Sequence, residues 1–351
     1  MKLSPVILAG LAIGCAPAGD SSAQGASAAQ PAAGSSQAKG AASGAPQLAF
    51  PVACTIGQTC EVQNYVDRDP GPGAQDYRCG TNTYQEHGGV DIRLQDLKAQ
   101  AAGVAVLAAA SGTVARLRDG VADISVKTQG AAAVAGQECG NGVVIDHGGG
   151  WETQYCHVAQ GSVVVKVGDA VEAGQPIARI GLSGNTEYPH LHLTVRKDGK
   201  VVEPFAPEFA PAACYTGAAG NGLWNARAAS AMQYKPGAVL NAGFAGGPVS
   251  MEMIEAGAIA PPARAATALV AYVRAINLRG GDVQKLTVKG PDGAVVATGA
   301  QPPLDRSKAQ YMAFVGRRAP PGGWAPGQYL AEYVVERSGK PAVTRKFALR
   351  L

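Results

Sequence analysis

Pro189-His190-Leu191-His192-Leu193 is a short stretch in which imidazole and leucine side chains alternate. A β-strand has a side-chain period of two, so an extended chain here places both imidazoles on one face and both leucines on the other. Two histidines that serve only the structure would give the same alternation. The stretch therefore predicts a strand and leaves the role of its histidines open.

The sequence around this stretch also favours strands. Glycine and proline, 47 and 23 of 351 residues, favour turns and short strands over long helices. Over residues 48–215 we expect an all-β domain, because short apolar runs there are punctuated by glycine. The runs are Gly103-Val104-Ala105-Val106-Leu107, Gly112-Thr113-Val114-Ala115, Gly142-Val143-Val144-Ile145, Thr153-Gln154-Tyr155-Cys156, Ser162-Val163-Val164-Val165 and Pro176-Ile177-Ala178-Arg179-Ile180.

Within this domain, Gly168-Asp169-Ala170-Val171-Glu172-Ala173-Gly174-Gln175-Pro176-Ile177 is similar to the turn-rich unit of lipoyl-carrier-like β folds. The tip of this hairpin has no lysine that would carry a prosthetic group, which counts against a carrier protein. The segment therefore predicts a lipoyl-like β unit as part of the all-β fold.

A second strand-rich region covers residues 263–351, after a connector at 216–262. Its pattern predicts a small C-terminal β-sandwich, with a turn at Gly290-Pro291-Asp292-Gly293. It has no histidine and no cysteine, so we do not expect it to carry the chemistry. We expect Trp324 and the tyrosines in the sandwich core rather than on a binding face. Candidate strands are 268–273, 284–288, 294–297, 310–315, 328–335 and 343–347.

Residues 1–14 have the pattern of an export signal, one lysine followed by an apolar run too short to remain as a membrane span. Leu11-Ala12-Ile13-Gly14-Cys15 resembles a bacterial lipobox, in which the signal is cut before the cysteine and that cysteine is lipidated. A plain secretory signal with an incidental cysteine is the alternative. Residues 15–47 are almost only Ala, Gly, Ser, Gln and Pro, which predicts a flexible tether.

Lipidation of Cys15 would leave an even number of cysteines in an exported chain, which indicates up to three disulfides. Six cysteines allow 15 pairings, among which the sequence does not choose, although Cys54 with Cys60 would form a local loop. No Cys-x-x-Cys pair occurs, which argues against a zinc ribbon or a thioredoxin-type site. The six are Cys54, Cys60, Cys79, Cys139, Cys156 and Cys214.

Charge argues against nucleic acid as a partner. The formal net charge is only +4, and lysine and arginine do not cluster anywhere in the sequence. The electrostatic attraction that drives nucleic-acid binding therefore has no source.

All five histidines fall between positions 87 and 192. In Glu86-His87-Gly88-Gly89-Val90-Asp91-Ile92 a histidine and an aspartate, both metal-binding residue types, stand four apart. The glycine pair favours a loop entering a strand, because glycines weaken a helix. Two more segments, Asp146-His147-Gly148 and Tyr155-Cys156-His157, precede the alternating stretch.

In this order the segments resemble the lysostaphin-like (LytM-type) zinc metallopeptidases, in which a His-x-x-x-Asp and a His-x-His segment frame a Tyr-x-His segment. The run Gly181-Leu182-Ser183-Gly184-Asn185-Thr186 before the His-x-His strand is also similar to the family. The resemblance covers about residues 80–196. It implies one zinc ion per chain, with His87, Asp91 and His192 as ligands and His157 and His190 as the catalytic pair.

Two features of this region stand apart from the resemblance. His147 lies in an Asp-His-Gly turn, for which we expect a structural role. Residues 116–140 depart from the compact family pattern and look like an insertion, which leaves substrate preference open.

The implied site has the chemistry of a hydrolase. Two neutral imidazoles and one carboxylate leave the fourth tetrahedral position open for water, as in catalytic zinc sites. Zinc would lower the pKa of that water toward ~7 and polarise the scissile carbonyl. One of His157 and His190 would accept the water proton, while the other stabilises the oxyanion and protonates the leaving amine. The sequence does not assign the two roles.

The resemblance, export signal and tether together predict a zinc-dependent endopeptidase that is lipid-anchored at Cys15 on the periplasmic side of the cell envelope, with the outer membrane as the expected membrane. The expected substrate is the peptide cross-link of peptidoglycan, with D-Ala to diaminopimelate bonds favoured over glycine bridges. The alternative is a non-hydrolytic regulator that activates a separate cell-wall amidase. The sequence leaves open the oligomeric state and whether the C-terminal sandwich binds the wall or only adds stability.

Overall fold

The structure is a computed structural model and describes residues 44–208, 213–217 and 222–351. The expected signal peptide at 1–14, Cys15 and most of the expected tether at 15–47 lie outside the described residues. The residues that are described belong to one compact unit. None of their helices is both long and apolar enough to cross a bilayer.

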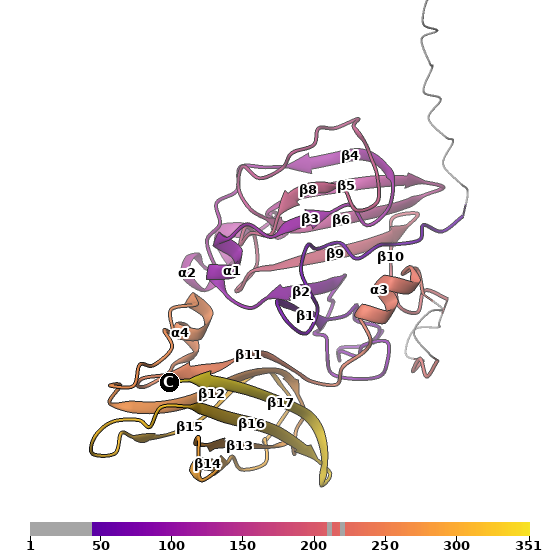
Figure 1. Cartoon of the computed structure of the whole chain (residues 1–351). Helices are drawn as coiled ribbons and strands as arrows, with labels where there is room; N and C mark the ends of the chain where they lie inside the picture. Colours follow the sequence, from indigo (N-terminus) through magenta and orange to yellow (C-terminus); the bar gives the residue numbers. More distant parts are fainter. Residues whose placement is uncertain (1–43, 209–212, 218–221) are drawn as a thin grey trace, which may run out of the picture. The chain divides into compact units, whose positions relative to one another are not determined.

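An eight-stranded antiparallel sheet forms the first region (Figure 1). Its strands follow the order β1-β2-β9-β6-β5-β4-β7. β10 pairs with the C-terminal half of β9, beyond the residues of β9 that pair with β2. The strands are β1 (Cys60–Asn64), β2 (Val90–Leu94), β4 (Gly112–Arg118), β5 (Asn141–Gly148), β6 (Trp151–Val158), β7 (Ala170–Val171), β9 (His190–Lys197) and β10 (Lys200–Val202).

Smaller elements complete this region. β3 (Ala105–Leu107) and β8 (Pro176–Arg179) form a two-stranded sheet. Helix α1 (Leu97–Ala101) begins after Asp96, whose side chain accepts a hydrogen bond from the Ala99 amide and caps the helix. The helices α2 (Val126–Gln129) and η1 (Ala131–Val134) lie in the segment expected to be an insertion.

Strand β9 confirms the alternation expected from the sequence. Leu191 and Leu193 are fully buried in the core of the first region, and His190 and His192 point to the other face of the strand. Val90 and Ile92 of the neighbouring β2 are also fully buried in that core. The apolar faces of these two adjacent strands therefore fix which side chains remain for the opposite face.

One expected strand is wrong. Residues 162–165 have no strand conformation, although their sequence is rich in valine. The amides of Gly161 and Val163 donate to the carboxylate of Asp119, at 2.6 and 3.1 Å. Within the segment Asp119 thus takes the Val163 amide, although the next amide, Val164, donates to the Ile177 carbonyl oxygen of β8 at 3.0 Å.

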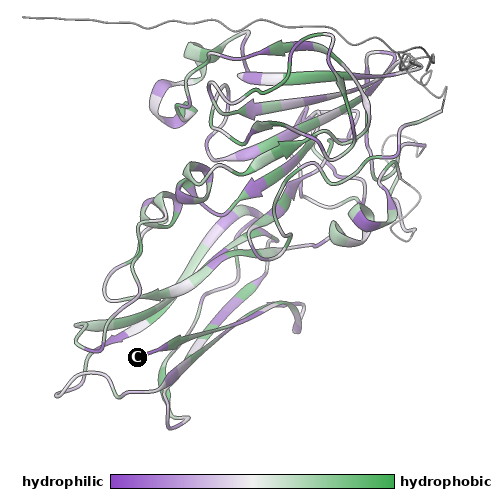
Figure 2. Ribbon diagram, turned by 45° about the horizontal axis from the view of Figure 1, so that its top comes forward, coloured by the Kyte–Doolittle hydropathy of each residue, from purple (hydrophilic) through white to green (hydrophobic). Residues whose placement is uncertain are grey.

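The C-terminal region is a β-sandwich, as expected. One sheet has the order β11-β12-β15 and the other β14-β13-β16-β17. β16 alternates exposed and buried residues, and Figure 2 shows hydrophobic and hydrophilic residues mixed along these strands. Trp324, Tyr329 and Tyr333 are buried in the shared core, which confirms the core interpretation for them. The strands are β12 (Ala268–Leu278), β13 (Val283–Lys289), β14 (Val295–Ala300), β15 (Lys308–Arg318), β16 (Gln328–Arg337) and β17 (Lys340–Arg350).

The segment expected to be a connector, 216–262, has structure of its own. It holds α3 (Ala226–Ala231), β11 (Ala238–Ala245) and α4 (Met251–Ala256). β11 pairs with β12 along its whole length, so the first sheet of the sandwich begins with Ala238, ahead of 263. Apolar and polar residues do not alternate regularly over residues 238–245, so the sequence pattern did not predict a strand there.

Three disulfides link the six remaining cysteines: Cys54–Cys60, Cys79–Cys214 and Cys139–Cys156. The first is the local loop that the sequence suggested. The second joins residues 135 apart in the chain, and the third joins the end of the insertion to β6.

Candidate metal centre

Strand pairing brings Asp91 and His192 together. β2 and β9 are antiparallel neighbours, and their register places Asp91 directly opposite His192. Residues opposite each other in such a pair lie on the same face, with Cβ atoms about 5 Å apart. His87 lies four residues before Asp91, in the loop that enters β2. Gly89 lets this loop pass close to β9, because a Cβ there would lie 2.6 Å from His192 Nε2 and from the Leu193 carbonyl oxygen.

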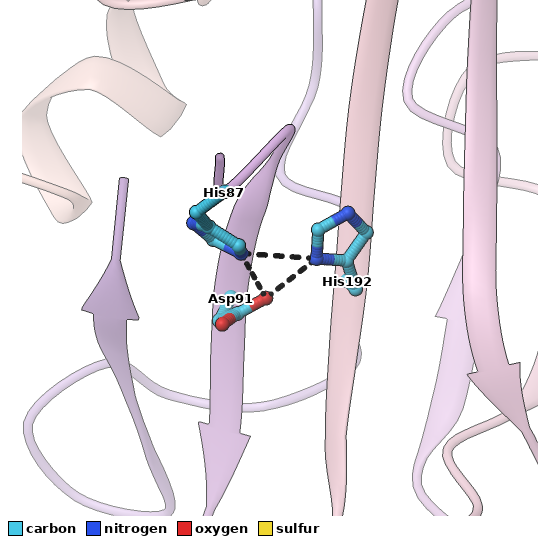
Figure 3. Close-up of side chains that lie close together, drawn as sticks. All are labelled: His87, Asp91 and His192. Carbon is cyan, nitrogen blue, oxygen red and sulfur yellow. Dashed lines mark hydrogen bonds and ion pairs between the residues drawn. The ribbon is translucent and has the colours of Figure 1, made fainter. Parts of the chain in front are cut away.

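Three donor atoms from these residues converge (Figure 3). Asp91 Oδ1 lies 3.1 Å from His87 Nε2 and 2.9 Å from His192 Nδ1. The two imidazole nitrogens are 3.1 Å apart. His87 and Asp91 are buried, and His192 is partly exposed. A nitrogen, nitrogen and oxygen donor set that is open on one side fits a metal ion.

The other polar atoms of the three residues have partners that fix their orientation. His87 Nδ1 lies 2.7 Å from the carbonyl oxygen of Tyr65, so an Nδ1–H donates there and Nε2 keeps its lone pair for the centre. Asn64 Nδ2 donates to Asp91 Oδ2 at 2.9 Å, and His192 Nε2 is 3.1 Å from Thr194 Oγ1. Such outer contacts are typical of metal ligands.

Electrostatic interactions in the cluster favour the charged form of Asp91. Burial alone raises the pKa of Asp91, but the surrounding imidazoles of His87, His190 and His192 outweigh burial and hold this pKa well below its usual range. Burial lowers the pKa of His192, against the opposing effect of Asp91. At neutral pH the carboxylate is therefore charged and His192 is neutral, as metal binding requires. At His87 burial lowers the pKa, but Asp91 outweighs burial and raises it, so a metal ion would compete with a proton there.

His157 and His190, the expected catalytic pair, lie beside the cluster. Their ring centres are 4.7 Å apart, and His190 Nε2 is 3.4 Å from Asp91 Oδ1. His157 Nδ1 lies 2.8 Å from the Ser183 carbonyl oxygen, and His190 Nδ1 lies 3.0 Å from that of Tyr188. The His157 ring therefore carries its proton on Nδ1 and has Nε2 as an acceptor, whereas each ring nitrogen of His190 faces an acceptor oxygen.

His157 is held in an unusual backbone conformation. Its φ is +63°, in the left-handed region that costs a residue with a side chain about 1–3 kcal/mol. The amide of His157 donates to the carbonyl of Cys139 at 2.9 Å, and the Cys139–Cys156 disulfide ties the same two segments. Burial, together with His190 and His192, holds the pKa of His157 well below its usual range.

The fifth histidine lies apart from this group. His147 Nδ1 lies 2.8 Å from the Ser111 carbonyl oxygen and Nε2 lies 2.8 Å from Thr153 Oγ1, so both ring nitrogens have local partners. This arrangement agrees with the structural role expected for it.

The sequence did not indicate two sets of residues at the site. Asn64 and Tyr65 reach it from the end of β1 and the loop after it, and Tyr65 contributes through its backbone carbonyl, which leaves no side-chain pattern to find. A cleft of about 670 Å³ beside Asp91, His157 and His190 is also lined by residues 277–278 and 307–310 of the sandwich. The absence of histidine and cysteine there gave no reason to expect this.

Comparison with known proteins identifies the domain that carries these residues. Residues 85–204 match the sequence profile of Peptidase family M23. The chain is 42% identical over 62 residues to the Murein hydrolase activator EnvC of Escherichia coli (strain K12), covering 18% of this chain and 14% of that protein. It is 46% identical over 66 residues to the Peptidoglycan DD-endopeptidase ShyA of Vibrio cholerae serotype O1, covering 18% and 14%.

A longer match is 30% identity over 124 residues to an uncharacterized metalloprotease of Haemophilus influenzae, covering 35% of this chain and 21% of that protein. The matched segments thus span no more than about a fifth of these relatives.

Among solved structures, the catalytic domain of the prophage-encoded M23 protein EnpA from Enterococcus faecalis is 21% identical with a TM-score of 0.30, over 42% of this chain and 92% of that one. The catalytic domain of lysostaphin from Staphylococcus simulans is 23% identical with a TM-score of 0.26, over 40% and 85%.

Proposed function

From the Peptidase family M23 domain that this chain carries at residues 85–204, we propose that the protein is a zinc-dependent endopeptidase that hydrolyses peptide cross-links of peptidoglycan. The observation that carries the proposal is the convergence of His87 Nε2, Asp91 Oδ1 and His192 Nδ1 beside a second pair of histidines. A regulator has no need for a complete set of donors together with two oriented imidazoles.

His87, Asp91 and His192 would hold the zinc ion. Bound there, zinc would supply Lewis acidity, which acidifies water and polarises a carbonyl. Among the chain's own residues, the rings of His157 and His190 lie beside the cluster, and His157 has Nε2 as an acceptor. One of them would take the proton of the attacking water, and the other, carrying a proton on Nε2, would donate to the carbonyl oxygen and then pass that proton to the leaving amine. The cleft beside them holds the peptide.

The substrate and the location are parts of the same proposal. The similarity to a protein named as a peptidoglycan DD-endopeptidase supports the cross-link as substrate. The lipobox-like segment ending at Cys15 and the three disulfides support an exported protein anchored on the periplasmic side, with the outer membrane as its membrane. In such an envelope the cross-link joins D-Ala to diaminopimelate, which is the bond we propose is cut.

The second candidate is a non-hydrolytic regulator of a separate amidase. Similarity to a protein named as a murein hydrolase activator favours it. The two candidates differ in one respect that is simple to measure: only the peptidase needs a metal and releases cross-linked peptides itself.

Zinc stoichiometry and product analysis on one preparation test the proposal. We expect about one zinc per chain at neutral pH and new uncross-linked muropeptides when the zinc-loaded protein is added to isolated peptidoglycan. His192→Ala should lose both, and Lys346→Ala, a change at an exposed side chain, should keep both. A zinc-loaded wild type that leaves all muropeptides unchanged would sink the peptidase and favour the regulator.

A further inference from the structure

The sandwich contributes to the cleft that contains the site. Asp91, His157 and His190 line it, together with Asn277 at the end of β12 and residues 307–310 at the start of β15. Lys308 pairs with Leu278 in the β12–β15 ladder, so the two segments reach the cleft as one unit. A domain that served only to bind peptidoglycan at a distance from the site would have no need to line this cleft.

The sandwich residues that line the cleft, 277–278 and 307–310, are called the sandwich wall of the cleft. Buried contacts connect this sandwich wall to the strands of the site. Arg93, the residue opposite His190 in the β2–β9 ladder, is fully buried. Its Nη2 donates to Gln310 Oε1 at 3.2 Å, and its Nη1 donates to Gln63 Oε1 at 2.9 Å. Asn277 Nδ2 donates to the Gln63 carbonyl oxygen at 2.6 Å. The wall and the histidine-bearing strand therefore share one hydrogen-bonded network.

The wall supplies the cleft with a cation. Among the described residues that line the cleft, Lys308 is the one lysine or arginine. The two carboxylates in the lining have other partners: Asp91 belongs to the metal cluster, and Glu187 is paired with Lys127 at 2.9 Å. Lys308 Nζ lies 2.5 Å from Asp305 Oδ1, and the Asp305 side chain is 63% exposed. The Lys308 side chain itself is 19% exposed, while its partner Asp305 is largely in water and also pairs with Arg306, so a ligand carboxylate in the cleft can compete for Lys308.

The wall also supplies an amide donor. Because Gln310 Oε1 accepts from Arg93, the orientation of its amide is fixed. Among the described residues its Nε2 has no hydrogen-bond partner, which makes it available to a peptide in the cleft. A lysine and an amide donor two residues apart on one strand lie on the same face of it. This is a suitable pair for a carboxylate or a backbone carbonyl.

We infer that the C-terminal sandwich is part of the substrate site, and that Lys308 binds a free carboxylate of the cross-linked peptide. The inference rests on the proposed function. The proposed substrate offers such a carboxylate. When one amine of diaminopimelate forms the cross-link, the carboxylate on the same carbon atom stays free and lies next to the amide bond that is cut. Lys308 is thus a specificity residue and takes no part in the hydrolysis.

Binding and cleavage of a defined pair of peptides test this. The probes are a cross-linked peptide dimer with free carboxylates and the same dimer with those carboxylates amidated. With wild-type, zinc-loaded full chain we expect the amidated dimer to bind about tenfold more weakly, as for loss of one charge-assisted hydrogen bond. Lys308→Met should bind the free dimer about tenfold more weakly and no longer distinguish the two, whereas Lys308→Arg should retain the distinction.

Two matched variants complete the design. Lys285→Met removes a lysine of β13 that is paired with Glu336, and it should bind both dimers as the wild type does. Asp305→Asn removes the partner of Lys308 and keeps the cation, so binding of the free dimer should be unchanged or tighter.

The outcomes separate this inference from the proposed function. Cleavage of the dimer with equal binding by wild type and Lys308→Met would overturn the role of Lys308 and leave the peptidase intact. Binding that depends on both Lys308 and the carboxylate, without any cleavage, would support the substrate site and refute the peptidase. Absence of binding by wild type to either dimer would overturn the inference.

Discussion

Asp91 and His192 face each other across the β2–β9 ladder, with Oδ1 and Nδ1 2.9 Å apart. The pair is a consequence of register: a shift of one residue would turn His192 into the core and Leu191 or Leu193 toward Asp91. Because Leu191, Leu193, Val90 and Ile92 are fully buried, the apolar core holds this register. The packing of the leucines thus determines the geometry of the metal donors.

Asn64 is predicted to be required for full metal affinity. Its Nδ2 donates to Asp91 Oδ2, which leaves Oδ1 directed at the two imidazoles. Asn64→Ala should weaken zinc binding by about 10–100-fold, as for other outer partners of metal ligands. Competition with a chromophoric chelator measures this change. The control is Asn185→Ala, which changes an exposed asparagine that also lines the cleft and should leave zinc affinity unaltered.

How far the sequence predicts the site follows from which contacts are local. His87 and Asp91 are four residues apart, and His190 and His192 share one strand face, so patterns in single segments revealed them. Asn64 lies 27 residues from Asp91, and its contribution depends on β1 pairing with β2, which no local pattern encodes. Residues 307–310 reach the cleft only because the sandwich packs on the first region through Arg93 and its partners.

The same limit applies to the fold. Residues 310–315 and 328–335 formed strands as their alternation predicts, because each has one face in the sandwich core. Residues 162–165 did not form a strand: the Val163 amide donates to the Asp119 side chain and the Ser162 amide to the Ala159 carbonyl oxygen, although Val164 donates to Ile177 of β8. A run of valines suits the pleated surface of a β-sheet, but tertiary contacts determine whether the run pairs with a neighbouring strand.

The stability of the metal-free protein is predicted to depend on pH through His157. Burial, reinforced by His190 and His192, lowers the pKa of His157 in the folded state, whereas the unfolded chain takes up this proton near pH 6.5. The unfolded state therefore binds more protons below about pH 6.5, so this contribution to stability is present above that pH and is lost as pH falls. For one proton the slope reaches about 1.4 kcal/mol per pH unit.

Urea unfolding of metal-free wild type and His157→Gln from about pH 5 to 8 checks this. The free energy of unfolding should fall less steeply with decreasing pH in the variant below about pH 6.5. Above that pH the two curves should run parallel, and their separation gives the pH-independent effect of the substitution. Parallel curves over the whole range would refute the role assigned to His157.

The Cys139–Cys156 disulfide is predicted to position His157. Cys156 precedes His157 in β6, and the Cys139 carbonyl accepts from the His157 amide. The double variant Cys139→Ser/Cys156→Ser should lower the free energy of unfolding by about 3 kcal/mol. Its kcat should fall at least about tenfold, since small misplacements of catalytic groups are costly. Zinc stoichiometry should stay unchanged, because the three donors lie on β2, β9 and the loop before β2.

The matched control for this experiment is Cys54→Ser/Cys60→Ser, which removes a disulfide with no contact to His157. It should lower stability with a much smaller effect on kcat. Equal loss of kcat in the two double variants would show that the disulfides act only through stability.

Glu255 is predicted to hold the sandwich wall against the first region. Its Oε2 accepts from Arg93 at 2.8 Å and also from Arg274, and both guanidinium groups are fully buried. Burial lowers the pKa of Arg93, an effect that the Glu255 carboxylate opposes. Glu255→Gln would leave two buried cations without an anion, and breaking a buried ion pair in this way costs about 3–5 kcal/mol. Glu252→Gln, an exposed change on the same helix, should cost less than about 1 kcal/mol.

Thermal unfolding of both variants measures this difference, and binding of the free-carboxylate dimer connects it to the cleft. If Glu255 holds residues 307–310 in place, Glu255→Gln should weaken dimer binding well below the unfolding temperature, whereas zinc stoichiometry stays at the wild-type value. A variant that is destabilised yet binds the dimer normally would mean that Arg93 alone, through Gln63 and Gln310, is sufficient to position the wall.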